Sequence, residues 1–461
     1  MHWKENGVDK VTIHQIGYYL VLSVCLTTSC SGSGAGNGKT QKDEMPPGYR
    51  GAHARQMEDA EEAGIMPISD AVHVETGLDV LVNDGTDVLN GARVGIITNH
   101  TGVAKDGRHI VDLLFSAEEV QLVAIFGPEH GVRGVEPDGK SVKSRTDSAT
   151  GLPIYSLYGK TRRPTEEMVD RLDVLIFDMQ DVGARFYTYI YTMALAMEAA
   201  ALNGKKFIVL DRPNPITGAE VEGPMLESGF ESFVGMYKIP VRHGMTVGEL
   251  AMLFKGEGWI EGADSLDLKV IPMRGWRREL WFDQTDVPWI SPSPSMKTLS
   301  TAKVYPGTCL IEGTNMSEGR GTDKPFEKIG APWIKPKILA NELNKLGLEG
   351  VVFEPVEFKP AALLPSVPNP KYKDQLCGGV YVRVIGRELF EPVRTGVSII
   401  WTLSKLYPDN FDWSPTINRL YGSDRLKTGV ENGISLEEIL DGHSRGLEDF
   451  MILRSKYLLY D

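Results

Sequence analysis

Four short apolar runs follow one another along the first half of the chain. They cover residues 92–97, 122–126, 173–178 and 206–211. Their apolar residues are continuous rather than alternating, which is typical of strands buried on both faces of a parallel sheet. The segments between them, at 108–115, 165–172 and 187–202, carry apolar residues at helical spacing. This alternation of strand and helix predicts a Rossmann-like, doubly wound parallel sheet.

The second half of the chain has a less regular pattern. We predict helices at 246–254, 393–406 and 435–458, and strands at 266–272, 351–355 and 379–385. This mixture predicts an α+β auxiliary domain. Because 461 residues suffice for two domains, we place the Rossmann-like domain at 73–240 and the α+β domain at 241–461.

Polar residues directly follow each of the four predicted strands. In open α/β folds, ligands bind at the carboxyl edge of the sheet, where such strand-end residues meet. The strand-end candidates for a binding site are Asn99, His100, Glu129, His130, Asp178, Asp181, Arg185, Tyr187, Arg212 and Asn214. Candidates from the second half are His243 and, in a glycine-rich loop at 312–325, Glu312, Asn315, Glu318 and Arg320.

Glu129 has the most informative setting of these residues, between Gly127-Pro128 and Gly131. In a dry cleft, a carboxyl group has a raised pKa and can act as a general acid. The alternative is a carboxylate that only accepts backbone N–H bonds in a tight turn. We favour the general acid, because the flanking glycines leave room for a ligand.

The other strand ends also allow two interpretations each. Asn99 and His100 either bind sugar hydroxyls or cap the following helix, and Asp178 and Asp181 either bind a ligand or cap their loop. Arg185 is a candidate anion clamp. The loop at 212–215 contains two prolines, and such a rigid loop suits a binding site because it loses little entropy when a ligand binds.

Charge and motifs exclude several classes of function. The net charge of −13 argues against a nucleic-acid partner. The first strand is not followed by G-x-G-x-x-G, so the sequence gives no support for a dinucleotide cofactor. His100 and His130 are far apart and no H-E-x-x-H occurs, which disfavours a metal site. A G-x-S-x-G serine elbow is also absent.

The N-terminal region has the features of a bacterial lipoprotein signal. The apolar run at 16–26 is too short to span a bilayer, and small residues lead directly to Cys30. We therefore expect a signal peptide at 1–30, lipidation of Cys30 and a flexible tether at 31–72. The alternative is a plain secretory signal with an incidental cysteine. The expected location is the cell envelope, with a lipid anchor in the periplasm or at the outer membrane.

Several longer motifs resemble a single family. They are G-I-I-T-N-H-T-G, F-G-P-E-H-G-V-R-G, D-M-Q-D-V-G-A-R-F-Y-T-Y, D-R-P-N-P-I, P-V-R-H-G-M-T-V-G-E-L-A and Y-P-G-T-C-L-I-E-G-T-N-M-S-E-G-R-G-T. The family is that of the exo-acting β-N-acetylmuramidases, glycoside hydrolase family 171, formerly a domain of unknown function. The resemblance covers residues 73–460 and implies removal of terminal N-acetylmuramic acid from non-reducing ends of peptidoglycan fragments. It also implies two domains with a cleft between them and a catalytic glutamate, which corresponds to Glu129.

Glycoside cleavage needs a proton donor and a second group on the opposite side of the bond. With Glu129 as general acid, the candidates for a second carboxylate are Asp178, Asp181 and Glu318. The substrate's own acetamido group is an alternative nucleophile, which a carboxylate would orient. Candidates to bind the lactyl carboxylate of muramic acid are Arg185, Arg212 and Arg320, and those to stack on a sugar are Tyr187, Tyr189 and Trp289.

Two other classes of function compete with this interpretation. A non-catalytic lipoprotein would use the same cleft only to capture sugar fragments. A nucleotide-dependent enzyme would account for the Rossmann-like alternation, but the phosphate-binding glycines are missing and a fold alone does not determine function.

Overall fold

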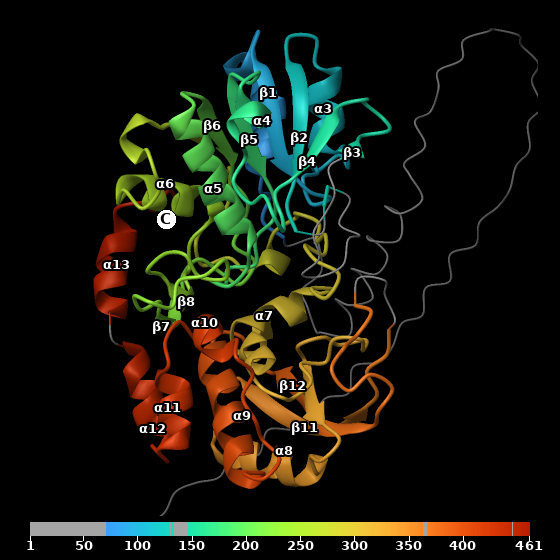
Figure 1. The fold of residues 1–461 in the computed structure, drawn as a ribbon, viewed down its shortest axis with the longest axis vertical. Helices are drawn as coiled ribbons and strands as arrows, with labels where there is room; N and C mark the ends of the chain where they lie inside the picture. Colours follow the sequence, from blue (N-terminus) through green and yellow to red (C-terminus); the bar gives the residue numbers. More distant parts are fainter. Residues whose placement is uncertain (1–70, 130, 133–144, 363–366, 445) are drawn as a thin grey trace, which may run out of the picture. The chain divides into compact units, whose positions relative to one another are not determined.

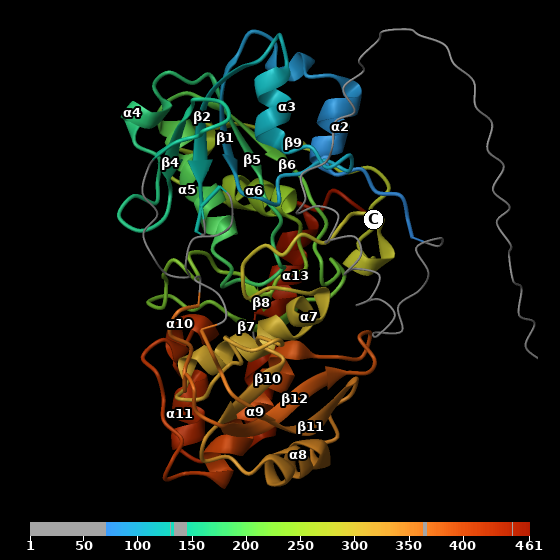
Figure 2. The same ribbon diagram turned by 90° about the vertical axis from the view of Figure 1, so that its right-hand side faces the viewer.

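The structure is a computed structural model of the chain. It describes residues 71–129, 131–132, 145–362, 367–444 and 446–461. His130 and Cys30 therefore lie outside the described residues, as do the predicted signal peptide and nearly all of the tether. Figures 1 and 2 show the arrangement of the helices and strands in two views.

The largest sheet has seven strands in the order β3-β4-β2-β1-β5-β6-β9. Their bounds are β1 Arg93–Thr98, β2 Gln121–Gly127, β3 Arg145–Thr146, β4 Pro153–Ser156, β5 Val174–Asp178, β6 Lys206–Leu210 and β9 Asp267–Ile271. Every neighbouring pair is parallel except β3 and β4, at one edge. The structure thus confirms the predicted parallel sheet and its four central strands.

Helices cover both faces of this sheet, as Figures 1 and 2 show. Alternate residues of β5 belong to different hydrophobic cores: Leu175 and Phe177 to one, Val174 and Ile176 to the other. The first core contains residues of α4 (Glu166–Val169), α5 (Tyr189–Leu202) and α6 (Val247–Gly256). The second contains residues of α2 (Gly77–Asp84) and α3 (Ile110–Ser116). Burial on both faces explains why the central strands β1, β2, β5 and β6 are apolar between their first and last residues.

The second half contributes an antiparallel sheet in the order β10-β12-β11, and a separate pair of strands, β7 and β8, extends across the predicted boundary at residue 240. The strands are β7 Glu222–Met225, β8 Pro240–Arg242, β10 Lys328–Ala331, β11 Val351–Phe358 and β12 Cys377–Val384. The helices are α7 Leu299–Thr308, α8 Pro336–Lys345, α9 Pro392–Leu406, α10 Ile417–Tyr421, α11 Arg425–Glu431, α12 Leu436–Asp441 and α13 Leu447–Ser455. Short 3-10 helices are η2 Asp87–Leu89, η3 Ala263–Ser265, η4 Phe282–Gln284, η5 Cys309–Gly313 and η6 Gly442–Ser444. This is the predicted α+β composition.

The helix predicted at 435–458 is interrupted. α12 ends at Asp441 and α13 begins at Leu447, after Gly446 with a φ of 77°. A left-handed residue cannot continue a right-handed helix, and glycine adopts that conformation without a steric penalty.

The predicted domain boundary at residue 240 stays a prediction, but two features bear on it. The edge strand β9, which pairs with β6, comes from beyond that residue. One hydrophobic core also extends without interruption from Phe177 of the large sheet to Val380 of the small one.

Candidate active site

The carboxyl ends of β1 and β5 lie side by side at the point where the strand order of the large sheet reverses. The chain proceeds from β1 to β2 on one side and returns to β5 on the other. In doubly wound folds, ligands bind in the crevice at this switch point. The polar residues that follow β1 and β5 are therefore the natural starting point for an active site.

Hydrogen bonds join the turns after these two strands. Asn99 Oδ1 accepts from the backbone N–H of Thr101 at 2.9 Å and from its hydroxyl at 2.6 Å. The same hydroxyl oxygen accepts from the backbone N–H of Gln180 at 2.9 Å. The Gln180 amide then donates to the carbonyl oxygen of Pro213, in the loop after β6, at 2.8 Å. The side-chain carbonyl oxygen of Asn99 thus helps to fix three strand ends. Its Nδ2 is buried with no hydrogen-bond partner in the described part of the chain, so Asn99 remains a binding candidate.

Arg212 and Asp178 form a buried ion pair between the ends of β5 and β6. Arg212 Nε donates to Asp178 Oδ1 at 2.5 Å, and Nη2 donates to Oδ2 at 3.0 Å. The remaining nitrogen, Nη1, carries no hydrogen bond to any described residue. Both Asp178 oxygens thus accept hydrogen bonds from the Arg212 guanidinium, and these bonds fix its orientation. The Nη1 group of Arg212 can still donate to a ligand.

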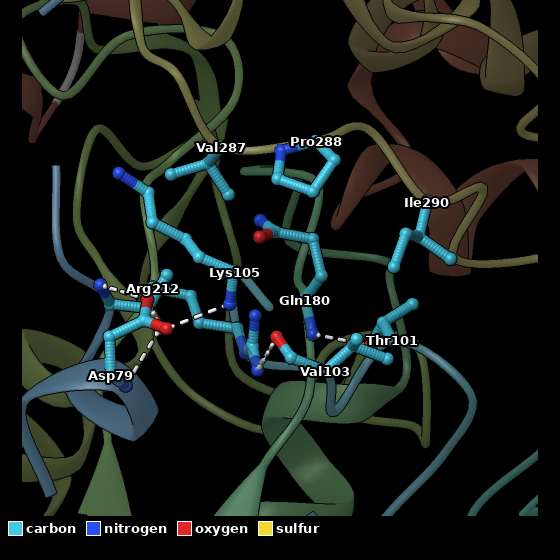
Figure 3. Close-up of a pocket in the computed structure, with 10 residues that line it drawn as sticks. Asp79, Thr101, Val103, Lys105, Gln180, Arg212, Val287, Pro288 and Ile290 are labelled. Atoms are coloured by element: carbon cyan, nitrogen blue, oxygen red, sulfur yellow. Dashed lines mark hydrogen bonds between the residues drawn. The ribbon is translucent and has the colours of Figure 1, made fainter. Parts of the chain in front are cut away.

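A small cavity opens beside this ion pair (Figure 3). Its lining residues are Thr76, Asp79, Thr101, Val103, Lys105, Gln180, Arg212, Val287, Pro288 and Ile290. In Figure 3, Val287, Pro288 and Ile290 face the polar strand-end residues across it. Its enclosed part admits a group about the size of a water molecule. It is therefore too small to enclose a sugar ring.

Glu129 follows β2 and lies beside the start of α5. Its Oε2 accepts a hydrogen bond from the Thr188 hydroxyl at 3.0 Å, and its side chain is half-buried. Glu129 is not one of the described residues that line the cavity. Its role as general acid stays a prediction, with Thr188 as a newly identified partner that sequence reasoning missed.

The segment 291–295 connects the strand ends to the glycine-rich loop. His100 Nε2 is 2.7 Å from the carbonyl oxygen of Ser291, and the Tyr189 hydroxyl donates to that of Pro292 at 2.6 Å. From the other side, Arg320 Nη1 donates to the Ser295 hydroxyl at 3.2 Å. Although far apart in sequence, His100 and Arg320 thus contact the same short segment.

Within the glycine-rich loop, Arg320 Nη2 donates to Glu312 Oε1 at 2.7 Å. Glu318 is buried, with Oε1 at 3.6 Å from Arg320 and Oε2 at 3.4 Å from Lys371. The hydrogen-bond partners of the Asn315 side chain lie outside this loop. Its amide forms hydrogen bonds with the backbone of Asn410 and Asp412. Glu318 and Arg320 remain candidates, whereas Asn315 has a structural role in fixing the loop.

Arg185 does not have the geometry of an anion clamp. It is fully buried, and its two terminal nitrogens donate at 2.8–3.0 Å to carbonyl oxygens of Pro224, Ile239, Leu420 and Tyr421. Gly422 leaves the space that this guanidinium needs, since a Cβ there would lie 2.6 Å from Nη2. The guanidinium was expected to bind an anionic ligand, but it donates to these four carbonyl oxygens instead. We therefore drop Arg185 as a ligand-binding candidate.

Asp181 and His243 form a buried pair. Asp181 Oδ2 accepts from the backbone N–H of Gly183 at 2.7 Å and lies 3.8 Å from His243 Nε2. His243 Nδ1 accepts from the backbone N–H of Met245, so the ring proton is on Nε2 and faces Asp181. Burial raises the pKa of Asp181 to about 7 and lowers that of His243 to about 3. Burial thus favours the neutral form of both side chains.

The remaining candidates are held by protein partners. Asn214 bonds the backbone of Ile216 and Met245, and a Cβ at Gly183 would lie 2.4 Å from its Oδ1. Tyr187 is buried and packs edge-on against two other tyrosines. The Trp289 indole donates to a backbone carbonyl. None of these three side chains is among the described residues that line the cavity.

The described part of the chain contains no group of three or more His, Cys, Asp or Glu residues placed to hold a metal ion. None of its helices is both long and apolar enough to cross a membrane.

Comparisons with known proteins match both halves of the chain. The N-terminal domain of the exo-beta-N-acetylmuramidase NamZ matches residues 94–300, and its C-terminal domain matches residues 303–460. The chain belongs to the NamZ family. Peptidoglycan beta-N-acetylmuramidase NamZ of Bacillus subtilis (strain 168) is 49% identical over 389 residues, which are 84% of this chain and 91% of that protein. The family resemblance inferred from the motifs is confirmed.

Two crystal structures from Bacteroides fragilis NCTC 9343, both of DUF1343 family proteins, have a similar fold. One has a TM-score of 0.78 and 38% identity, and covers 85% of this chain and 100% of its own. The other has a TM-score of 0.68 and 33% identity, with coverages of 84% and 99%. The combination of a Rossmann-like sheet and an α+β part is thus shared with these NamZ-like proteins.

Proposed function

We propose that this chain is an exo-acting glycoside hydrolase that releases terminal β-linked N-acetylmuramic acid from non-reducing ends of peptidoglycan fragments. The observation that carries the proposal is the 49% identity to a peptidoglycan beta-N-acetylmuramidase over most of both chains. The two NamZ domains match this chain in the same order. Peptidoglycan-derived glycans are accordingly the substrates.

Glu129 is the general acid of the proposed reaction. It follows a buried strand, it is half-buried, and a hydroxyl donor orients one of its oxygens. As general acid, this carboxyl group would donate a proton to the glycosidic oxygen of a bound substrate.

Asp181 and Glu318 are the better candidates for the second carboxylate. Arg212 occupies both oxygens of Asp178, so Asp178 is less suited to contact a sugar directly. Asp181 Oδ1 is buried and has no hydrogen-bond partner in the described part of the chain. Such an oxygen can orient the acetamido group of the substrate or act opposite Glu129.

The direct test is hydrolysis of a chromogenic β-N-acetylmuramide, with the matching β-N-acetylglucosaminide as control. We expect release of the chromophore together with free N-acetylmuramic acid. Binding of the muramide without release would favour the alternative, a non-catalytic sugar-binding protein.

Arg212 binds the lactyl carboxylate that distinguishes muramic acid from glucosamine. Its Nη1 has no hydrogen bond to a described residue, and its side chain lines the cavity at the strand ends. Lys105 also lines this cavity, although its ammonium pairs with Asp286 at 2.6 Å. A guanidinium suits a carboxylate because of its planar array of donors.

Arg212→Lys is therefore expected to lower the preference for the muramide over the glucosaminide roughly 10- to 100-fold, the effect of losing a charged hydrogen bond of ~1.5–3 kcal/mol. The measurement is the ratio of kcat/KM for the two substrates, which does not depend on the folded fraction. Arg320→Lys is the matched control. A drop in the ratio with Arg320→Lys, and none with Arg212→Lys, would assign the lactyl group to Arg320.

The proposed location is the bacterial cell envelope, through a lipid on Cys30, in the periplasm or at the outer membrane. The apolar run at 16–26 and the small residues before Cys30 support this proposal. A lipid anchor would keep the enzyme close to the cell wall that supplies its substrates.

Cys30→Ser is expected to abolish incorporation of labelled palmitate and to move the protein from the membrane fraction to the soluble fraction. Cys25→Ser is the matched control, because Cys25 lies inside the apolar run. Labelling that survives Cys30→Ser would exclude Cys30 as the lipid site.

A further inference from the structure

Lys371 places its ammonium group among five oxygens of one loop. Four are backbone carbonyl oxygens at 2.9–3.4 Å from Nζ, those of Ile311, Glu312, Thr314 and Met316. The fifth is Glu318 Oε2, at 3.4 Å. We call these five atoms the oxygen cage. The neighbouring Tyr372 adds a hydrogen bond of 2.7 Å from its hydroxyl to the carbonyl oxygen of Asn315.

The cage holds its cation mainly by charge. An ammonium group has three N–H donors, fewer than the five oxygens around it. Carbonyl oxygens that point at a common centre repel one another unless a cation lies between them, and such groups replace the hydration shell of a potassium ion in the same way. The positive charge of Lys371 therefore helps to keep residues 311–316 in their observed conformation, together with hydrogen bonds such as those from Thr314 to the Ile311 carbonyl oxygen.

This loop leads directly to two candidate residues of the active site. Glu318 closes the cage and is only 5% exposed. Arg320 follows two residues later and donates to both Glu312 and Ser295. Glu312 contributes its backbone oxygen to the cage and its side chain to Arg320. A change in the cage would thus shift the carboxylate and the guanidinium together.

We infer that Lys371 is a positioning residue for the glycosidase reaction, and that its ammonium occupies what is otherwise a site for a monovalent cation. The inference rests on the proposed function, because it assumes that Glu318 and Arg320 act on the substrate. Removal of the side chain should leave a site for potassium or ammonium. The distances of 2.9–3.4 Å are too long for calcium, at about 2.3–2.6 Å, or magnesium, at about 2.0–2.1 Å.

The experiment compares Lys371→Ala, which empties the cage, with Lys371→Met, which fills it with an uncharged chain. We expect kcat/KM on the chromogenic muramide to fall roughly 10- to 100-fold in both, as for other misplaced catalytic groups. Potassium or ammonium chloride should restore much of the activity of Lys371→Ala, relative to choline chloride at the same ionic strength. The activity of Lys371→Met should stay low in every salt.

Lys373→Ala is the matched control, since this exposed lysine donates to one carbonyl oxygen, that of Pro368. It should keep wild-type kcat/KM and show no specific response to potassium. Wild-type kcat/KM in Lys371→Ala, or an equal potassium response in Lys371→Ala and Lys371→Met, would overturn the inference.

If Lys371→Ala does not fold, Lys371→Gln takes its place, because it removes the charge and keeps two donors. Wild-type kcat/KM in Lys371→Gln would also overturn the inference.

A separate readout distinguishes failure of this inference from failure of the proposed function. If the wild-type protein does not hydrolyse the muramide, the proposed function is wrong, but the cage can still be tested by thermal unfolding. Potassium should raise the Tm of Lys371→Ala and not that of Lys371→Met, because only the former binds the ion in its folded state. Equal Tm shifts in the two variants would exclude the cation site.

Discussion

Glu129→Gln is expected to lower kcat on a chromogenic muramide on the order of 10²–10⁴-fold, the usual contribution of a general acid. Glutamine keeps the shape of the side chain and can still accept the hydrogen bond from Thr188, but its amide group is not acidic enough to transfer a proton. Affinity for the muramide should therefore stay near that of the wild type. Steady-state kinetics give kcat, and calorimetric titration of the variant gives the affinity.

Glu166→Gln is the matched control for this prediction, because Glu166 is an exposed glutamate in the first turn of α4. It should leave kcat and affinity unchanged. If Glu129→Gln keeps more than about a tenth of the wild-type kcat, Glu129 is not the general acid.

Arg185→Met is expected to destabilise the protein by at least about 3 kcal/mol, since the carbonyl oxygens of Pro224, Leu420 and Tyr421 lose their guanidinium donors and each costs ~1–3 kcal/mol when left unpaired. The Ile239 carbonyl oxygen keeps a second donor, the backbone N–H of Leu226. These carbonyls belong to the β7–β8 hairpin region and to the end of α10, so one guanidinium links two distant parts of the chain. The measurement is the free energy of unfolding in urea. The KM of the remaining folded enzyme should be unchanged.

The control for Arg185→Met is Arg383→Met. Arg383 is 58% exposed and pairs with Glu354 on the surface of the small sheet, where an ion pair contributes about 0–1 kcal/mol. If Arg185→Met has wild-type stability and a higher KM for the muramide, Arg185 binds the ligand after all.

The sequence predicted the main sheet well because each central strand is buried on both faces. Such a strand must be continuously apolar, and its end is marked by the first polar residue, as at Asp178 and Glu129. The helices between these strands were recognised for a similar reason, since their apolar residues recur at helical spacing. The break at Gly446 was missed because its effect depends on a backbone conformation rather than on apolar spacing.

The roles of the polar residues were harder to predict, because they depend on partners that are distant in sequence. Arg185 looked like an anion clamp beside Asp178 and Asp181, but its partners at 224, 239, 420 and 421 are backbone carbonyls, which no motif can reveal. Lys371 gave no signal either, since its oxygen cage forms only when the loop folds around it. Arg212 and Asp178, in contrast, follow neighbouring strands, and their proximity was predictable from the sheet.

In the proposed reaction, Glu129 and Arg212 act on the same bound sugar. A crystal structure of Glu129→Gln with a disaccharide that carries N-acetylmuramic acid at its non-reducing end would show whether they do. We expect the glycosidic oxygen at about 2.6–3.2 Å from the side chain of residue 129, with the lactyl carboxylate at Arg212 Nη1. A sugar bound beyond hydrogen-bond reach of residue 129, or with its lactyl group away from Arg212, would contradict the claim.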